Sequence, residues 1–339
     1  MRYLLLLMLI LTVRQGAARP GAARSGEDQP RKWVFRQPKM GSMFAVQTWS
    51  ADSAAAATAA ANAFRLVDSL NLIFSDYLPE SELSRLSASA GSGRFVPVSP
   101  ALWDILSVSK MAWERSEGTF DVTVGQLTQL WRVSRKSRKL PEAEILKKAL
   151  ATVGSRYLVL KDHQIRLERV GTRLDLGAIG KGYAAQRMLE AMEKQGFPET
   201  LCDAAGNMAV GKGHGGEKWK IGIEIPGTNG ELLEKYLPLE SEGISTSGDA
   251  YQAVIIDGKS YAHIVSPRTG LGLGYKRQVT IVARDAATAD WLSTACYMLP
   301  PDKAIRLAAS EKAQVLILEN TGNGIKTWSS GFKKFGVEE

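Results

Sequence analysis

The sequence has few cysteines and few histidines. Its 339 residues include 2 Cys and 3 His, and two cysteines are too few for a disulfide framework. Cys202 and Cys296 both lie in apolar surroundings, "TLCDAAG" and "STACYML". Buried free thiols are therefore expected, although a bridge between them remains an alternative if the protein is exported.

Beyond its first residues, the chain contains no apolar run long enough to span a membrane. The start, "MRYLLLLMLILTVRQGAARPGAARS", has an early Arg, a short apolar run and then small residues, the order of a secretory signal. The run is shorter than the roughly 20 apolar residues of a transmembrane helix, and no Cys follows it that could carry a lipid. We expect a signal peptide at 1–25, a flexible segment at 26–37 and one domain at 38–339.

No surface expected from the sequence has the composition of a nucleic-acid groove. The formal net charge is +8, from 43 Lys+Arg against 35 Asp+Glu, and part of the excess lies in the leader and the residues after it. A second basic cluster, "WRVSRKSRKLPEAE" at 131–144, is expected to be a solvated loop. Aromatic residues are not interleaved with these basic residues as they are in a nucleic-acid groove.

The pattern of apolar residues predicts an α+β fold with a helical lobe. Strands occur in hairpin-like runs and do not alternate strictly with helices, which argues against a doubly wound parallel sheet. The predicted helices are 51–72, 99–114, 140–154 with Gly154 as its C-cap, 181–194, 286–299 and 301–310. The predicted strands are 156–160, 164–169, 219–226, 251–257, 277–284 and 313–319.

Two segments carry groups that suit an anionic ligand or a cation. The glycine-rich turn at 173–182 leads into a helix, whose first amides attract phosphate, but its spacing is neither a Walker A loop nor a dinucleotide fingerprint. Asp290 and Thr294 are four residues apart and share a helix face, so two hard oxygens could bind Mg²⁺. Tight packing of the glycines, and capping by the Asp and Thr, remain the alternatives.

Two further residues stand at turns. Asp121 follows a small-residue turn, and His263 lies between a short strand and a Pro-Arg-Thr-Gly turn. An imidazole has a pKa near 6.5 and can accept a proton at neutral pH. Asp121 could serve only the turn, and His263 could simply satisfy a strand edge.

Taken together, these segments resemble the ApbE family, the FAD:protein FMN transferases. The resemblance spans about residues 38–300. It rests on "KMGSMFAV", "FSDYLPESELSRLS", "GTFDVTVGQLTQLW", "LDLGAIGKGYAAQRM", "STSGDAYQ", "YAHIVSPRTG" and "ATADWLSTA", which follow one another in the family's order.

The resemblance implies a fold, an activity and a set of site residues. The fold is ApbE-like and T-fold-related, with mostly antiparallel sheets and packed helices. The activity is Mg²⁺-dependent transfer of FMN from FAD to a Ser or Thr hydroxyl of an exported, periplasmic target protein that carries a flavinylation motif, with release of AMP. The implied roles are a catalytic His263, metal ligands at Ala178 (through its carbonyl), Asp290 and Thr294, and FAD contacts at Met40, Tyr77, Thr119, Phe120, Asp121, Asp175, Lys181 and Ile264.

The chain departs from the family's pattern at two turns. Ala205, Gly206 and Asn207 stand where relatives usually have Gly-Gly-Asp, and Ser266 stands where many have Asp. The retained Asp290, Thr294 and His263 favour an active transferase. Hydrolysis of FAD to FMN and AMP, or an exported protein that binds flavin without turnover, remain the alternatives. The sequence contains no acceptor motif of its own, so self-flavinylation is not expected.

Overall fold

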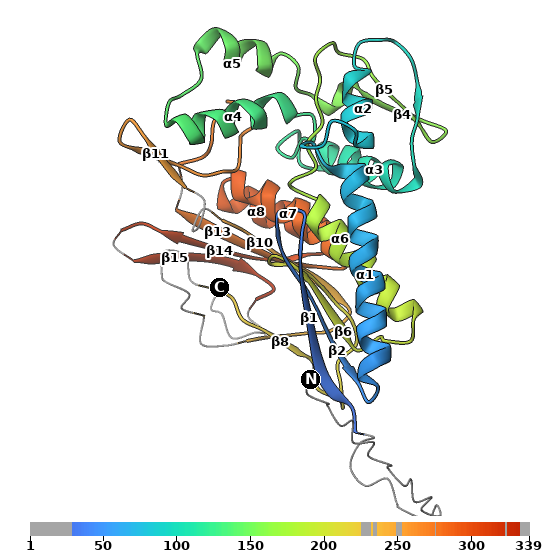
Figure 1. Ribbon diagram of the computed structural model, residues 1–339. Coiled ribbons are helices and arrows are strands. Elements are labelled where there is room, and N and C mark those ends of the chain that lie inside the picture. Colours follow the sequence, from blue (N-terminus) through green and yellow to red (C-terminus); the bar gives the residue numbers. More distant parts are fainter. Residues whose placement is uncertain are drawn as a thin grey trace, which may run out of the picture.

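The centre of the computed structural model is a large antiparallel sheet (Figure 1). The structure describes residues 29–224, 232, 236–248, 253–274, 276–322 and 324–332. Over this part of the chain the sheet has eight strands in the order β1-β2-β6-β7-β10-β13-β14-β15, and every neighbouring pair is antiparallel. The strands are β1 (Arg31–Lys39), β2 (Ser42–Ser50), β6 (Thr200–Ala204), β7 (Asn207–Val210), β10 (Glu242–Gly248), β13 (Arg277–Ala283), β14 (Gln314–Asn320) and β15 (Ile325–Ser330).

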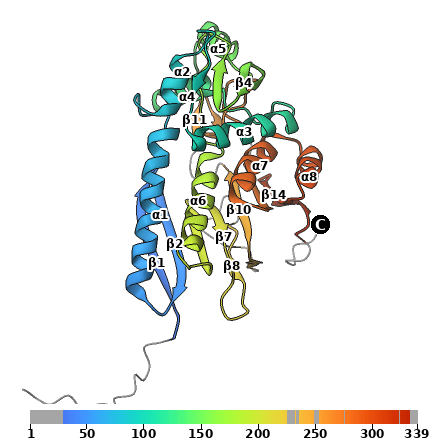
Figure 2. The same ribbon diagram turned by 90° about the vertical axis from the view of Figure 1, so that its right-hand side faces the viewer.

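One face of this sheet is covered by helices (Figures 1 and 2). They are α1 (Ser53–Phe74), α6 (Gly180–Lys194), α7 (Ala286–Met298) and α8 (Pro301–Ser310). α6 packs on β6 and β7, α7 packs on β10 and β13, and α1 packs on α6. α7 is buried around almost its whole circumference, from Ala286 to Tyr297, because it lies between the sheet and the other helices.

The other face of the sheet has its own, smaller core. The hairpin of β8 (Trp219–Ile221) and β9 (Leu237–Leu239) contributes Trp219 and Leu239 to it. These side chains pack with Val282 and Leu316, which come from β13 and β14. Residues of β13 are buried on both faces, which explains why its apolar residues do not alternate strictly with polar ones.

A helical lobe lies above one end of the sheet and helices (Figure 1). It contains α2 (Glu82–Ala88), α3 (Pro100–Arg115), α4 (Gly125–Ser137), α5 (Ala143–Leu150) and η1 (Ser155–Tyr157). A small sheet joins β3 (Val96–Pro97), β5 (Gln164–Leu167) and β4 (Leu158–Lys161). The hairpin of β11 (Val254–Ile256) and β12 (Lys259–Tyr261) packs beside α4 and α5 through a third core cluster.

The structure confirms the α+β class, the antiparallel sheet and the helical lobe. It also confirms Cys202 and Cys296 as buried free thiols. Among the described residues, no helix is both long enough and apolar enough to cross a bilayer. Residues 1–25, expected to be a signal peptide, lie outside the described part of the chain.

Three local expectations were wrong. The segment 26–37 was expected to be flexible, but from Arg31 onward it is strand β1, paired with β2 along its whole length. The basic cluster 131–144 was expected to be a solvated loop, but residues up to Ser137 belong to α4, whose Trp131 is 1% exposed. Gly154 is not a helix C-cap, since α5 ends at Leu150 and Gly154 precedes η1.

Candidate active site

A cavity of about 440 Å³ lies where the helical lobe meets the sheet and its helices. Its walls come from the loop after α1, from α4, from the segment before α6, from β10, from the loop after β12 and from α7. The predicted site residues that line it are Tyr77, Phe120, Asp121, Asp175, Ala178, Lys181, His263, Ile264, Asp290 and Thr294. Residues from widely separated segments thus share one cavity.

Two predicted residues do not line this cavity. Met40 lies in the tight turn between β1 and β2, with a positive φ of 47°, and packs against the main core. Thr119 is 6% exposed and precedes Phe120, which does line the cavity.

The end of the cavity formed by α6 and α7 depends on a close contact between these two helices. Gly182 lies in the first turn of α6, against the start of α7. A Cβ at this position would lie 2.2 Å from the Ala286 carbonyl oxygen and 2.6 Å from Asp290 Cβ. Only glycine allows the two helices to approach this closely, and this explains the third glycine of the "GAIGKG" turn.

This contact also provides a hydrogen bond at the start of α6. The Gly182 amide lies in the first turn of the helix, where amides have no carbonyl partner within the helix. It donates to Asp290 Oδ2 at 2.8 Å. The Ala178 carbonyl oxygen, just before the helix, has no hydrogen-bond partner among the described residues, and Ala178 lines the cavity.

Asp290 is the carboxylate at this end of the cavity, and it is 5% exposed. Burial raises the pKa of Asp290 to about 7, although the Gly182 amide and the Lys181 ammonium oppose the shift. Carboxylates are expensive to bury without a cation or several donors. Thr294, one turn later and 8% exposed, adds a hydroxyl to the same wall.

These donors would suit a magnesium ion. The Ala178 carbonyl, the Asp290 carboxylate and the Thr294 hydroxyl are all hard oxygens, and Mg²⁺ takes one or two protein carboxylates and fills its shell with water or phosphate. Within the described ranges, no group of three or more His, Cys, Asp or Glu side chains could hold a metal.

His263 lines the same cavity and is well shielded from solvent. Burial, followed by the positive charges of Arg135 and Lys181, lowers the pKa of His263 to about 4. Its Nδ1 atom is buried and has no hydrogen-bond partner among the described residues. The ring is therefore neutral at pH 7, and no strand edge uses its Nδ1 atom.

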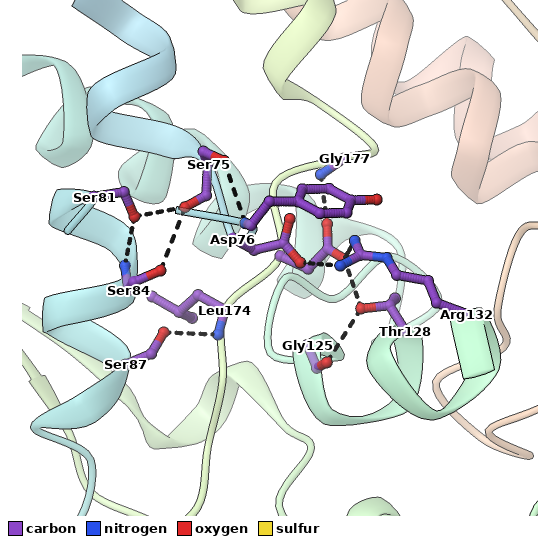
Figure 3. Close-up of polar contacts among 12 residues, drawn as sticks. Ser75, Asp76, Ser81, Ser84, Ser87, Gly125, Thr128, Arg132, Leu174 and Gly177 are labelled. Carbon is purple, nitrogen blue, oxygen red and sulfur yellow. Dashed lines mark hydrogen bonds and ion pairs between the residues drawn. The ribbon is translucent and has the colours of Figure 1, made fainter. Parts of the chain in front are cut away.

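The end of the cavity beside α4 contains charged side chains that form ion pairs within the protein. Arg132 of α4 forms ion pairs with Asp76, which follows α1, and with Asp175 Oδ2 at 3.1 Å (Figure 3). The Asp175 carboxylate also accepts from Thr128 Oγ1 at 2.6 Å and from the Gly177 amide at 2.7 Å. The ring of Tyr77, which is 72% exposed, stacks on the Arg132 guanidinium.

Sequence reasoning identified Tyr77 and Asp175 but missed Asp76, Thr128 and Arg132. The basic residues of α4 were read as a solvated loop, which hid Arg132 among them. Recognising 125–137 as an amphipathic helix would have placed Thr128 and Arg132 four residues apart on one face. Arg132 therefore joins two walls of the cavity that come from distant parts of the sequence.

Asp121 lies at the cavity wall, but its carboxylate serves the protein. Oδ1 accepts from the Thr123 amide at 2.8 Å and from Ser155 Oγ at 2.7 Å, and Oδ2 accepts from the Ser155 amide at 3.0 Å. These bonds tie the loop before α4 to η1. The carboxylate therefore fixes the shape of the wall, whatever Asp121 contacts there.

Comparison with known proteins decides the family. A sequence model described as "ApbE family" matches residues 40–317. The chain belongs to the ApbE family. An FAD:protein FMN transferase of Klebsiella pneumoniae (strain 342) is 29% identical over 310 residues, covering 88% of each chain. Another, from Haemophilus influenzae, is 30% identical over 279 residues, covering 79% of this chain and 81% of the relative.

Solved structures of ApbE proteins share the fold. The flavin transferase ApbE of Vibrio cholerae superposes with a TM-score of 0.81 at 26% identity, covering 90% of this chain and 99% of its own. The apo form of the Pseudomonas stutzeri flavinyl transferase ApbE also gives 0.81 at 26% identity, covering 92% and 99%. The expected ApbE-like architecture is thereby confirmed.

The departures from the ApbE pattern lie at turns that the structure now describes. Ala205 and Gly206 form the two-residue turn between β6 and β7, with φ of 56° and 92°. A turn with two positive φ values favours Gly or Asn at both positions, so Ala205 is strained. Ser266 still caps its turn, because its Oγ accepts from the amides of Arg268 and Thr269.

Proposed function

We propose that this protein transfers FMN from FAD to a Ser or Thr hydroxyl of an acceptor protein, in a Mg²⁺-dependent reaction that releases AMP. The observation that carries the proposal is that Ala178, whose carbonyl oxygen accepts no hydrogen bond from the described residues, lines the same cavity as the buried Asp290 carboxylate and Thr294. The names of the relatives, FAD:protein FMN transferase, supply the reaction that this arrangement suits.

Three groups would hold the metal: the Ala178 carbonyl, Asp290 and Thr294. When bound there, Mg²⁺ would neutralise charge on the diphosphate of FAD. Lys181 adds positive charge to the same region, since its ammonium influences both Asp290 and His263. The wall around the diphosphate is therefore positive on the side of α6.

His263 is the group that would accept the proton. The acceptor oxygen forms a bond to the FMN phosphorus, the bond from that phosphorus to the oxygen bridging to AMP breaks, and the hydroxyl proton passes to the imidazole. The low pKa of His263 keeps its ring neutral at pH 7, so the ring can accept a proton. The negative diphosphate would offset Arg135 and Lys181 and so raise the proton affinity of His263 when FAD is bound.

The charged network around Arg132 would hold the other part of FAD. Arg132 pairs with both Asp76 and Asp175, and Tyr77 offers an exposed ring that is supported by the guanidinium. An aromatic ring of this kind can stack on a planar heterocycle. Arg132, Asp76 and Asp175 would keep this wall in place through their contacts with one another.

One incubation distinguishes the proposed reaction from its alternatives. The protein is mixed with FAD, Mg²⁺ and a peptide that carries a Ser/Thr flavinylation sequence, and the products are followed by mass spectrometry and chromatography. Covalent FMN on the peptide with one AMP per transfer supports the proposal. Free FMN with an unmodified peptide indicates hydrolysis, and unchanged FAD indicates a binding protein; either result contradicts transfer.

We also propose that the protein acts outside the cytoplasm, in the periplasm of a bacterium. The proposal rests on the order of charge, apolar run and small residues at 1–25. Fusion of these residues to a reporter that is active only after export tests it. Export followed by cleavage near residue 25 is expected, and a reporter retained in the cytoplasm would contradict it.

A further inference from the structure

Thr294 is the last member of a row of hydrogen-bonded hydroxyl groups, of which Ser245, Ser293 and Thr294 are buried and Ser247 is half-buried. The row begins at the β6–β7 turn, where Ser245 Oγ donates to Asn207 Oδ1 at 2.6 Å. Ser245 Oγ lies 3.0 Å from Ser293 Oγ, and Ser293 Oγ lies 2.8 Å from Ser247 Oγ. Ser247 Oγ lies 3.2 Å from Thr294 Oγ1. The row therefore links the altered turn to a proposed metal ligand.

Proton counting gives this row a direction. Each hydroxyl has one proton, and Ser245 donates its proton to Asn207, so it has none for Ser293. Ser293 donates to the Asp290 carbonyl oxygen at 2.9 Å, so its proton is not available to Ser247. Ser247 must therefore donate to Ser293, which leaves Ser247 as an acceptor for the proton of Thr294.

The same contacts block the usual alternative for Thr294. In a helix, a Thr hydroxyl often donates to the carbonyl four residues earlier, which here belongs to Asp290. Ser293 donates to that carbonyl instead. A Thr294 proton directed at Ser247 leaves the lone pairs of Thr294 Oγ1 for the cavity, and a metal-binding hydroxyl must present lone pairs.

We propose that Ser293, held by its hydrogen bond to the Asp290 carbonyl oxygen, is a positioning residue that orients the Thr294 hydroxyl for metal binding. The inference rests on the proposed function, because it needs a cation at Thr294. Ser293 is 0% exposed and is not among the residues lining the cavity. It therefore acts only through its neighbours, and this makes it a clean target for substitution.

The test measures magnesium binding and does not depend on turnover. Mg²⁺ is titrated by calorimetry into FAD-saturated wild-type protein and into Ser293→Ala. We expect the variant to bind Mg²⁺ at least about tenfold more weakly, the usual effect of losing a partner that orients a metal ligand. Its affinity for FAD in the presence of EDTA should equal that of the wild type, because Ser293 does not reach the ligand.

A matched control breaks a hydroxyl pair elsewhere in the sheet. Thr200 Oγ1 donates to Thr48 Oγ1 at 2.7 Å between β2 and β6, and both residues are 0% exposed. Thr48→Val removes this bond without touching the cavity. It should leave Mg²⁺ affinity unchanged, and an equal loss in this variant would overturn the specific role of Ser293.

A double substitution tests the row as a unit. Ser247→Ala removes the link to Thr294, so Ser247→Ala with Ser293→Ala should bind Mg²⁺ no more weakly than Ser247→Ala alone. Losses that simply add, or wild-type affinity in Ser293→Ala, overturn the inference while leaving the proposed function intact. Absence of Mg²⁺ binding by the wild-type FAD complex overturns both, so the two failures are distinguishable.

Discussion

The two ends of the cavity solve the problem of buried charge in opposite ways. At the α4 end, Arg132 compensates Asp76 and Asp175 from within the protein. At the α6–α7 end, Asp290 has one backbone amide as its hydrogen-bond donor, the neighbouring carbonyl of Ala178 has none, and burial raises the pKa of Asp290 to about 7. The carboxylates at the first end therefore have a cationic partner within the protein, whereas the oxygens at the second end are available to bind a cation. We propose that the chemistry takes place at the second end.

Removing the charge of Asp290 should have the largest effect. Asp290→Asn keeps an oxygen that can accept from the Gly182 amide but removes the charge that would hold the metal. FMN transfer to a peptide should fall about 1,000-fold, the scale seen when a key electrostatic group is lost. Asp302→Asn, on the exposed first turn of α8, should keep wild-type activity. Near-normal transfer by Asp290→Asn would contradict the assignment.

His263, which lines the same cavity, should titrate with a lowered pKa. Its pKa is lowered from 6.5 to about 4, which corresponds to roughly 300-fold weaker proton affinity. As pH falls from about 6.5 towards 4, the unfolded chain binds this proton first, so the contribution of His263 to stability decreases in that window. NMR titration of the ring, assigned with His263→Gln, checks this. A pKa near 6.5 in the free protein would contradict it.

Adding a side chain where α6 contacts α7 should destabilise the fold around the α6–α7 end of the cavity. Gly182→Ala places a Cβ against the Ala286 carbonyl, and we expect a loss of about 3 kcal/mol in unfolding free energy, as for other overpacked sites. Urea denaturation measures the loss. Gly180→Ala, two residues earlier in α6, brings its added Cβ no nearer than 3.8 Å to Leu176 Cβ, so it measures the effect of an added methyl group without a steric conflict. Equal losses in the two variants would argue against the helix contact.

Removing the Arg132 ion pairs at the α4 end should weaken FAD binding without changing the dependence of that binding on magnesium. Arg132→Ala leaves Asp76 and Asp175 without their shared partner and removes the support of Tyr77. We expect about tenfold weaker FAD affinity with and without Mg²⁺, a modest value because the Arg132 side chain is 31% exposed. Flavin fluorescence titration measures it. Arg306→Ala, at an exposed pair on α8, is the control. A loss of FAD affinity seen only with Mg²⁺ would contradict the separate roles of the two ends.

The smallest expected effect is at the strained turn beside the cavity. Ala205→Gly should stabilise the protein by about 1 kcal/mol, because glycine adopts a φ of 56° without a Cβ penalty. Thermal unfolding measures the change. A decrease in stability would show that the Ala205 methyl group makes contacts that outweigh the strain.

Sequence patterns predicted the framework better than the site. The apolar spacing of 286–299 and 277–284 predicts α7 and β13, and it places Asp290 and Thr294 on one helix face. The family motifs pointed to residues that share the cavity. What the residues alone do not reveal is that Gly182 gives its amide to Asp290, because that bond joins positions 108 residues apart and depends on how two helices pack.

The failures of sequence reasoning have a similar cause. Arg132 lies in a run of basic residues. Only the burial of Trp131, its neighbour in α4, shows that this run begins within a helix. Its partners Asp76 and Asp175 are 56 and 43 residues away. Strand β1 was missed because its sequence, RKWVFRQPK, has only three consecutive apolar residues among charged and polar ones and lies next to the leader, where a flexible linker was expected.

The central claim is that a divalent cation binds at the junction of α6 and α7. Anomalous scattering from Mn²⁺ in a crystal of the FAD complex tests it most directly. The account predicts one strong peak about 2.2 Å from the Ala178 carbonyl oxygen, an Asp290 carboxylate oxygen and Thr294 Oγ1. A peak beside Asp76 and Asp175, or no ordered Mn²⁺ in an FAD-bound crystal, would contradict it.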